Sequence, residues 1–168
     1  MANILVLPTC AHVDAAAAAQ SIAAALPDAV VFNPLADAKR AADLIAAGKA
    51  DDWFDALVGE VAALGKQNVV IQGIQADAEN IFLAAQNVAL ATSFNAQIVF
   101  AASNEAGAEQ RVALAKQAFA GNTVFFAGVV GNAAAAQANE LADLGASGSL
   151  KTQLANCRAA PPKPPPAR

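Results

Sequence analysis

Residues 3–16 read NILVLPTCAHVDAA, and this stretch decides the fold class. The apolar run Asn3–Leu7 has the length of a strand, and a short loop follows it. Asp14 is a favourable N-cap for a helix that runs to Leu26 and stops before Pro27. A buried strand that turns directly into a helix is the first half of a β-α-β unit, so the stretch predicts an α/β domain.

Four more apolar runs of strand length recur along the chain, with helical stretches between them. The runs are continuous rather than alternating, which is typical of strands covered on both faces. We therefore expect a doubly wound, mostly parallel sheet of about five strands with helices on both faces, of the P-loop NTPase-like or Rossmann-like class. The further expected strands are Ala29–Phe32, Asn68–Gln72, Gln97–Ala101 and Thr123–Val130. The further expected helices are Asp37–Ala47, Asp51–Leu64, Asp77–Ser93, Glu105–Phe119 and Ala133–Leu144.

Charge is distributed unevenly. Residues 1–150 carry a net charge of −8 and the remainder carries +4. An acidic body argues against nucleic acid as a partner, and the tail has too few basic residues for a membrane-binding signal. No apolar run approaches the ~18 residues of a membrane span, and no Lys or Arg precedes the first strand as in a signal peptide. We expect a cytoplasmic protein in which Cys10 and Cys157 are reduced thiols, with a disulfide as the alternative.

The C-terminal end has a different composition from the rest of the chain. Residues 159–168 read AAPPKPPPAR and hold five of the eight prolines. Such a run is extended and does not pack as a helix or inside a sheet. We divide the chain into an α/β domain at residues 1–150 and a C-terminal segment at residues 151–168 that reads as a linker or a disordered tail. A frayed natural C-terminus is the alternative.

The loop after the first strand has the spacing of a phosphate-binding P-loop, G-x-x-x-x-G-K-[ST], with different residues. Thr9 and Asp14 stand at the glycine positions, Ala15 at the lysine position and Ala16 at the hydroxyl position. Loss of the lysine and the hydroxyl removes two charge-assisted contacts, about 3–6 kcal/mol or roughly two to four decades of affinity. The Asp14 carboxylate also stands where a phosphate would lie, and there it can cap the helix. We therefore expect a capped helix without a nucleotide or another cofactor.

A second nucleotide signal is also missing. P-loop proteins carry an acidic residue at the end of a buried strand to hold Mg²⁺, whereas the strand at 68–72 ends in the neutral Gln72. His12 is the only histidine, so one chain cannot build a His-based metal site or a Ser-His-Asp triad. We expect no nucleotide hydrolysis, no metal ligands and no catalytic residues.

Four polar residues follow strands at the edge where open α/β sheets bind ligands, and they are weak candidates for ligand contacts. They are Thr9, His12, Ser103 and Asn132. Each also has a structural explanation: His12 as an exposed loop residue, Ser103 or Asn104 as the N-cap of the next helix, and Asn132 as a turn former.

Two further pairs of residues have structural explanations. Trp53 and Phe54 are expected in the core or an interface. Lys39 and Arg40 are expected on a solvated helix face.

Read in order, several blocks resemble the N-terminal domain of the long, multidomain bacterial phosphate acetyltransferases (phosphotransacetylases). That domain is similar to dethiobiotin synthetase and has the P-loop fold, often with a degenerate loop. The resemblance covers roughly residues 3–135, and the family's polar site positions are replaced at Ala15, Ala16, Asn33, Gln72 and Ala133. The matching blocks are NILVLPT (3–9), VVFNPLA (30–36), NVVIQGIQA (68–76), FNAQIVFAASNEAGAEQRVALAKQAFAG (94–121) and NTVFFAGVVGNA (122–133).

The resemblance implies a regulatory or assembly role rather than catalysis. In that family a separate C-terminal domain transfers the acetyl group between coenzyme A and acetyl phosphate, and the N-terminal domain is implicated in metabolite regulation and oligomer stability. The implied partners are the C-terminal acetyltransferase domain of the same parent chain, other copies in a homo-oligomer, and a small-metabolite effector. Two alternatives remain open: an ATP-dependent ligase of the dethiobiotin synthetase type, and a free-standing protein-interaction module without a small ligand.

Overall fold

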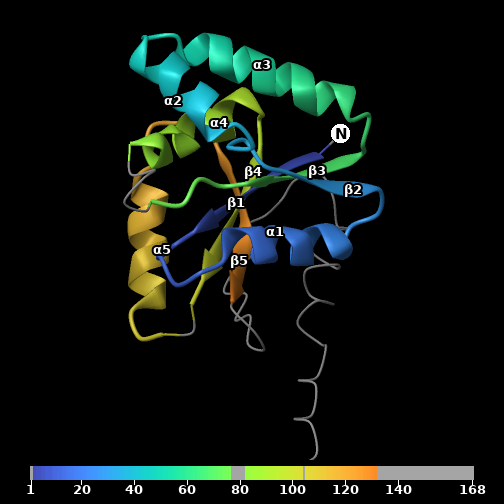
Figure 1. The fold of residues 1–168 in the computed structure, drawn as a ribbon. Coiled ribbons are helices and arrows are strands. Elements are labelled where there is room, and N and C mark those ends of the chain that lie inside the picture. Colours follow the sequence, from blue (N-terminus) through green and yellow to red (C-terminus); the bar gives the residue numbers. More distant parts are fainter. Residues whose placement is uncertain (1, 77–81, 104, 132–168) are drawn as a thin grey trace, which may run out of the picture.

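The computed structural model describes residues 2–76, 82–103 and 105–131. Their five strands form one parallel sheet in the order β2-β3-β1-β4-β5 (Figure 1). The predicted α/β class, with a Rossmann-like or P-loop-like sheet, is confirmed. The strands are β1 (Ala2–Pro8), β2 (Ala29–Phe32), β3 (Asn68–Gln72), β4 (Gln97–Ala102) and β5 (Phe125–Gly131). The helices are α1 (Ala15–Ala24), α2 (Ala38–Ala46), α3 (Ala50–Ala63), the short 3₁₀ helix η1 (Leu83–Gln86), α4 (Asn87–Ser93) and α5 (Ala108–Gln117).

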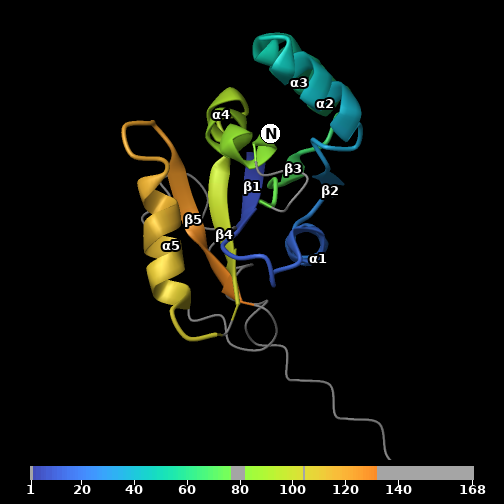
Figure 2. The same cartoon turned by 60° about the vertical axis from the view of Figure 1, so that its left-hand side comes forward.

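Helices cover both faces of the sheet, as the continuous apolar runs predicted. Along β1, Ile4 and Val6 join the apolar cluster beneath α1, whereas Leu5 and Leu7 join the cluster on the opposite face. The neighbouring strands β3 and β4 alternate in the same way. Figure 2 shows α1 and α5 on opposite sides of the sheet.

The two faces hold different amounts of apolar material. On one face α1 contacts β1, β2 and β3, and its buried residues are Ala15, Ala19 and Ile22. The other face carries the remaining helices and the buried aromatic side chains of α3, Trp53 and Phe54, which are 3% and 8% exposed. The core position expected for these two residues is confirmed.

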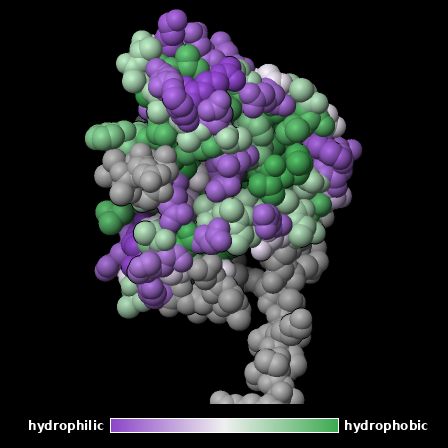
Figure 3. All heavy atoms as spheres, viewed as in Figure 1, coloured by the Kyte–Doolittle hydropathy of each residue, from purple (hydrophilic) through white to green (hydrophobic). Residues whose placement is uncertain are grey.

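The solvated face of α2 carries charged side chains, as expected for Lys39 and Arg40. Lys39 pairs with Asp43 one turn along, and Arg40 lies 3.9 Å from Glu60 of α3. The hydrogen bond from Lys39 to Asp43 raises the pKa of Lys39. Figure 3 shows hydrophilic side chains gathered over α2 and α3 at the top of the view.

Two predicted helix starts are corrected. The helix expected from Glu105 begins at Ala108, and its N-cap is Gly107 in the left-handed region (φ 83°), so the N-cap role proposed for Ser103 is wrong. In place of the single helix expected to end at Ser93, η1 precedes α4. Asn87 at their junction exchanges hydrogen bonds with the backbone N–H and C=O of Ile74, at 2.9 and 2.8 Å, which fixes the start of α4 from a distant strand end.

Several sequence-based predictions lie outside the described residues. They are the beginning of the Asp77–Ser93 helix, the N-cap alternative Asn104, Asn132, the Ala133–Leu144 helix, Cys157 and the segment 151–168. Within the part of the chain that the structure describes, none of the helices combines the length and the apolar character needed to cross a bilayer.

The chain leaves β3 in very close contact with β1. The N–H of Gly73 donates to the carbonyl oxygen of Val6 at 2.8 Å. A Cβ atom at position 73 would lie 2.4 Å from that oxygen and 2.7 Å from the Leu7 side chain. Both obstacles belong to the centre of the sheet, so neither can move cheaply.

We expect Gly73→Ala to lower the free energy of unfolding by about 1–3 kcal/mol, because the new methyl group overpacks the sheet. The matched control is Gly59→Ala in α3, where the added Cβ meets nothing within 4 Å. That change should raise stability by about 0.5–1 kcal/mol, because alanine favours the helix. Urea denaturation measures both. Equal stability of wild type and Gly73→Ala would contradict the close approach.

Asp28 joins the beginnings of β2 and β3. Its carboxylate accepts from Lys66 Nζ at 2.7 Å and from the backbone N–H of Gln67 at 3.1 Å. These two bonds hold the pKa of Asp28 below its ordinary value. Its backbone lies in the left-handed region at φ 44°, which Asp and Asn tolerate better than most residues.

Asp28→Asn should lower stability at neutral pH, with a pH-dependent difference from wild type. The carboxylate's contribution is complete above its unfolded-state pKa of about 3.9 and is lost as pH falls through the lower folded-state pKa. Urea denaturation at pH 7, 4 and 3 should therefore show the two proteins converging in acid. A constant difference from pH 7 to pH 3 would show that the Asp28 charge contributes nothing.

Candidate functional site

The carboxyl end of β1 lies between those of β3 and β4. In the sheet register Val6 has Gln72 of β3 on one side and Val99 of β4 on the other. From here β1 leads to α1 on one face, while β4 leads to α5 on the opposite face. Adjacent strands whose connections leave to opposite faces mark the switch point of an open sheet, where such folds bind ligands. We call this place the switch-point crevice after its position at the sheet edge, and we define it by residues 9–14, 72–75, 103, 105 and 111 alone.

The loop between β1 and α1 is closed by its own residues. Asp14 is the N-cap of α1, and its Oδ1 accepts from the backbone N–H of Ala17 at 2.9 Å, so the predicted cap is confirmed. Thr9 donates from both its backbone N–H and its hydroxyl to the carbonyl oxygen of Ala101, at 2.9 and 3.1 Å. Val13 is 2% exposed in the cluster beneath α1. The loop is therefore anchored to β4, capped at the helix and pinned by an apolar side chain.

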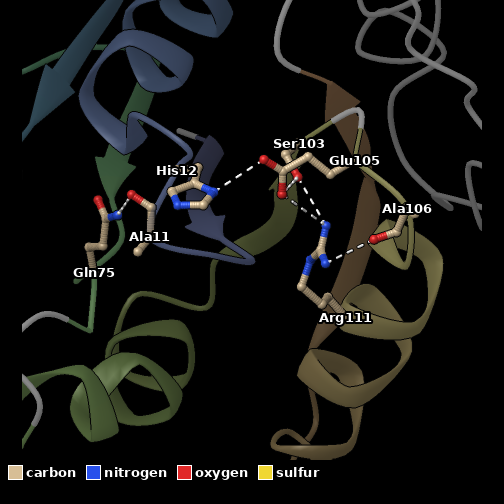
Figure 4. A network of polar contacts seen from close by, with 7 residues as sticks. All are labelled: Ala11, His12, Gln75, Ser103, Glu105, Ala106 and Arg111. Atoms are coloured by element: carbon tan, nitrogen blue, oxygen red, sulfur yellow. Dashed lines mark hydrogen bonds and ion pairs between the residues drawn. The ribbon is translucent and has the colours of Figure 1, made fainter.

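The strand order places the end of β3 beside this loop. Gln72, the neutral residue at the position where a P-loop protein has its acidic residue, is half-buried at the carboxyl end of β3. Three residues on, Gln75 donates from its side-chain amide to the carbonyl oxygen of Ala11 at 2.9 Å (Figure 4). The β1 loop is thus held from the β3 side as well.

On the β4 side, the polar side chains meet at Glu105. Its Oε1 lies 3.1 Å from His12 Nδ1, and its Oε2 lies 3.3 Å from the hydroxyl of Ser103 (Figure 4). Arg111 donates from Nη2 to the Ser103 hydroxyl at 3.0 Å and from Nη1 to the carbonyl oxygen of Ala106 at 3.2 Å. The same Nη2 lies 3.8 Å from Glu105 Oε2. These residues link the loop before α1 to the first turn of α5.

Burial increases from one end of this network to the other. The His12 side chain is 75% exposed, Glu105 is 54% exposed, Arg111 is 29% exposed, and Ser103 as a residue is 7% exposed. Arg111 Nε is buried and makes no hydrogen bond. A contact as exposed as His12–Glu105 contributes little stability, so the fixed part of the network is Ser103 with Arg111.

The candidate residues from the sequence are partly brought together here. Thr9, His12 and Ser103 all lie in the crevice, although Thr9 is engaged with the β4 backbone, and Asn132 lies outside the described residues. Three contributors were missed: Gln75, Glu105 and Arg111. Arg111 had a usable signal, because long side chains on a helix lean toward its N-terminus and so reach back over the preceding loop.

Cys10 lies in the loop between β1 and α1. It is a free, half-buried thiol, and it packs against the apolar cluster beneath α1. Among the described residues, no three His, Cys, Asp or Glu side chains are grouped so that they could hold a metal ion.

A concave region lies on α2 and α3, away from the switch point. It is an open groove of about 460 Å³, and its lining side chains include acids and bases that pair with one another. Asp37, for example, caps α2 by accepting from the N–H of Arg40 at 2.9 Å. We assign no site to this groove, which is lined by Asp37, Lys39, Arg40, Asp43, Leu44 and Asp52.

In comparisons with known proteins, no protein-family model and no curated protein matches this chain. The resemblance to phosphate acetyltransferases therefore remains a hypothesis drawn from the residues.

We expect Asp14→Ala to lower the free energy of unfolding by about 0.5–2 kcal/mol, because the Ala17 N–H loses its side-chain partner. Asp14→Asn should cost much less, since the amide oxygen can accept the same bond. Both are measured by urea denaturation at pH 7. An Asp14→Ala protein as stable as wild type would mean that the carboxylate is not needed at the helix N-terminus.

Proposed function

We propose that this chain is a non-catalytic regulatory or assembly domain of a phosphate acetyltransferase. Our expectation that the chain has no nucleotide chemistry rests on one observation: the chain's own Asp14 caps the first turn of α1. In a P-loop the free N–H groups at this place bind a phosphate, helped by the helix dipole. A fixed carboxylate there uses one of these donors, the Ala17 N–H, and repels an incoming phosphate.

The charges around the loop support the same proposal. Residues 9–16 contain no Lys or Arg to neutralise a triphosphate. Gln72, at the end of β3, offers a neutral amide where Mg²⁺ prefers a carboxylate. A dethiobiotin synthetase-like ligase would need both groups, so we rank that alternative lower.

The parent activity rests on the resemblance. In the parent enzyme a C-terminal acetyltransferase domain of the same chain would convert acetyl-CoA and phosphate to coenzyme A and acetyl phosphate, and this domain would stabilise a cytoplasmic homo-oligomer or sense a metabolite. The reading frame past Arg168 tests the parentage directly. An acetyltransferase domain there supports it, and a stop codon contradicts it.

A protein-interaction module is the second candidate, and exposed apolar side chains favour it. Phe82 is 85% exposed, Leu114 on α5 is 70% exposed, and Phe125 at the start of β5 is 53% exposed. These three side chains belong to different segments, and large apolar side chains in water mark a contact surface where they form one patch with their neighbours.

Isothermal titration of the full chain with Mg-ATP should give no binding heat, because the lysine, the hydroxyl and the acidic metal ligand are all replaced. A micromolar dissociation constant would overturn the non-catalytic assignment in favour of the ligase. A thermal-shift screen with NADH, pyruvate, acetyl-CoA and nucleotides then separates a sensor, whose Tm rises with one of them, from an interaction module, whose Tm responds to none.

A further inference from the structure

Glu105 occupies the switch-point crevice as a carboxylate tethered to the chain. Groups from both sides converge on it: His12 from the β1 loop, and Ser103 with Arg111 from the β4–α5 side. We propose that Glu105 stands in for an external oxyanion, and that the crevice binds a small phosphate- or carboxylate-bearing molecule on Arg111 and Ser103 when Glu105 swings away.

The donors for such an anion are already oriented. The Ser103 hydroxyl accepts from Arg111 Nη2 at 3.0 Å, so its own hydrogen is free to point toward the position of the Glu105 carboxylate, 3.3 Å away. The guanidinium is held in place by its bonds to Ser103 and Ala106. These bonds use two of its five N–H donors, and Nε makes none. Because Nε is buried, the donors left for an anion are the remaining hydrogens of Nη1 and Nη2.

Glu105 is the weakly held member of the network. Its side chain is 54% exposed, and its closest guanidinium nitrogen is 3.8 Å away, which is an ion pair but not a hydrogen bond. Its best contact is with His12, which is itself 75% exposed. Displacing Glu105 therefore breaks contacts that are loose and screened by solvent. The entering oxyanion gains donors that are fixed and partly shielded from water.

The position of this cluster distinguishes it from the phosphate loop. The cluster lies on the β4–α5 side of the crevice, whereas the lost P-loop positions lie between β1 and α1. Switch-point crevices are where open α/β sheets bind small molecules. The inference rests on the proposed regulatory role and gives the effector of that role a chemical class, an oxyanion.

Arginine Nε–H signals in a ¹⁵N–¹H NMR spectrum of the full chain provide the test, because the chain has only four arginines. Inorganic phosphate and malonate are titrated separately, with chloride keeping the ionic strength constant. We expect one Nε–H signal, identified by its loss in Arg111→Lys, to shift and saturate. A phosphate response indicates a phosphoryl ligand, and a malonate response indicates a carboxylate ligand.

Two variants test whether Glu105 competes with the external anion for Arg111 and Ser103. Glu105→Gln removes the internal anion but keeps the size of the side chain, so binding should tighten about tenfold. Arg111→Lys should weaken binding, measured through backbone amide shifts, by tenfold or more, because an ammonium cannot replace the planar fork. Arg40→Lys on α2 is the matched control and should bind as wild type does. Circular dichroism melting verifies that each variant is folded.

Absence of a saturable shift in both the wild type and Glu105→Gln, up to tens of millimolar of either anion, would overturn the oxyanion site. Equal affinity in wild type and Arg111→Lys would overturn it too. These failures are distinguishable from failure of the proposed function. If neither the anions nor Mg-ATP bind, the proposed assembly role is not contradicted. Binding of Mg-ATP, in contrast, contradicts the proposed function itself.

Discussion

The structure depends on β1, which has hydrogen-bonded strands along both of its edges and apolar clusters on both of its faces. Its backbone is hydrogen-bonded to β3 along one edge and to β4 along the other, while its side chains are buried alternately beneath α1 and on the opposite face. Residues 4–6 are fully buried, so they carry apolar side chains, and every backbone polar group there needs a partner within the sheet. A strand fixed in this way places its carboxyl end between two others, and so the side chains of three connections meet at one place.

The loop between β1 and α1 is held by hydrogen bonds for the same reason, because its polar groups also need partners. A phosphate would accept hydrogen bonds from the free N–H groups at the start of α1, and in this chain Asp14 accepts from one of them, that of Ala17. Thr9 and Gln75 add bonds between the loop and the strand ends beside it. The loop keeps the length of a phosphate-binding loop, but its polar groups are used to join the elements around it. Its contribution is thus to stability, whereas the remaining Nη hydrogens of Arg111 lie on the β4–α5 side.

The sequence indicated the elements well, because hydrophobic runs and helix caps are local signals. The strand at Asn68–Gln72 was predicted at its observed bounds, and Asp14 caps α1 as its residue type suggested. The start of α5 was predicted wrongly because it depends on Gly107 adopting a left-handed conformation, which outweighs the capping preference of Ser103. The break between η1 and α4 depends on Asn87 bonding to Ile74, a tertiary contact that no local pattern encodes.

The site was harder to predict than the fold, for a similar reason. His12 and Ser103 could be placed at the correct sheet edge, since both follow strands. The contact between His12 and Glu105 could not be predicted, because the two residues are 93 apart in the sequence and meet only through the order β3-β1-β4. That order depends on how the connections pack and not on any one segment. Arg111 lies a full helical turn beyond the loop, where a basic residue ordinarily reads as solvated surface.

Because α1 buries mostly alanine, we expect it to detach from the sheet at a lower free energy than the helices on the opposite face. This helix buries only Ala15, Ala19 and Ile22, whereas the opposite face buries large aliphatic and aromatic side chains. Detaching α1 therefore exposes less apolar surface than detaching the other layer, and segments with few buried apolar contacts open at lower free energy than the core. The amides of α1 should exchange with solvent sooner than those of β1 and β4. Because Asp14 caps α1, each such opening would also free the helix end of the loop that carries His12, while Thr9 and Gln75 hold the rest.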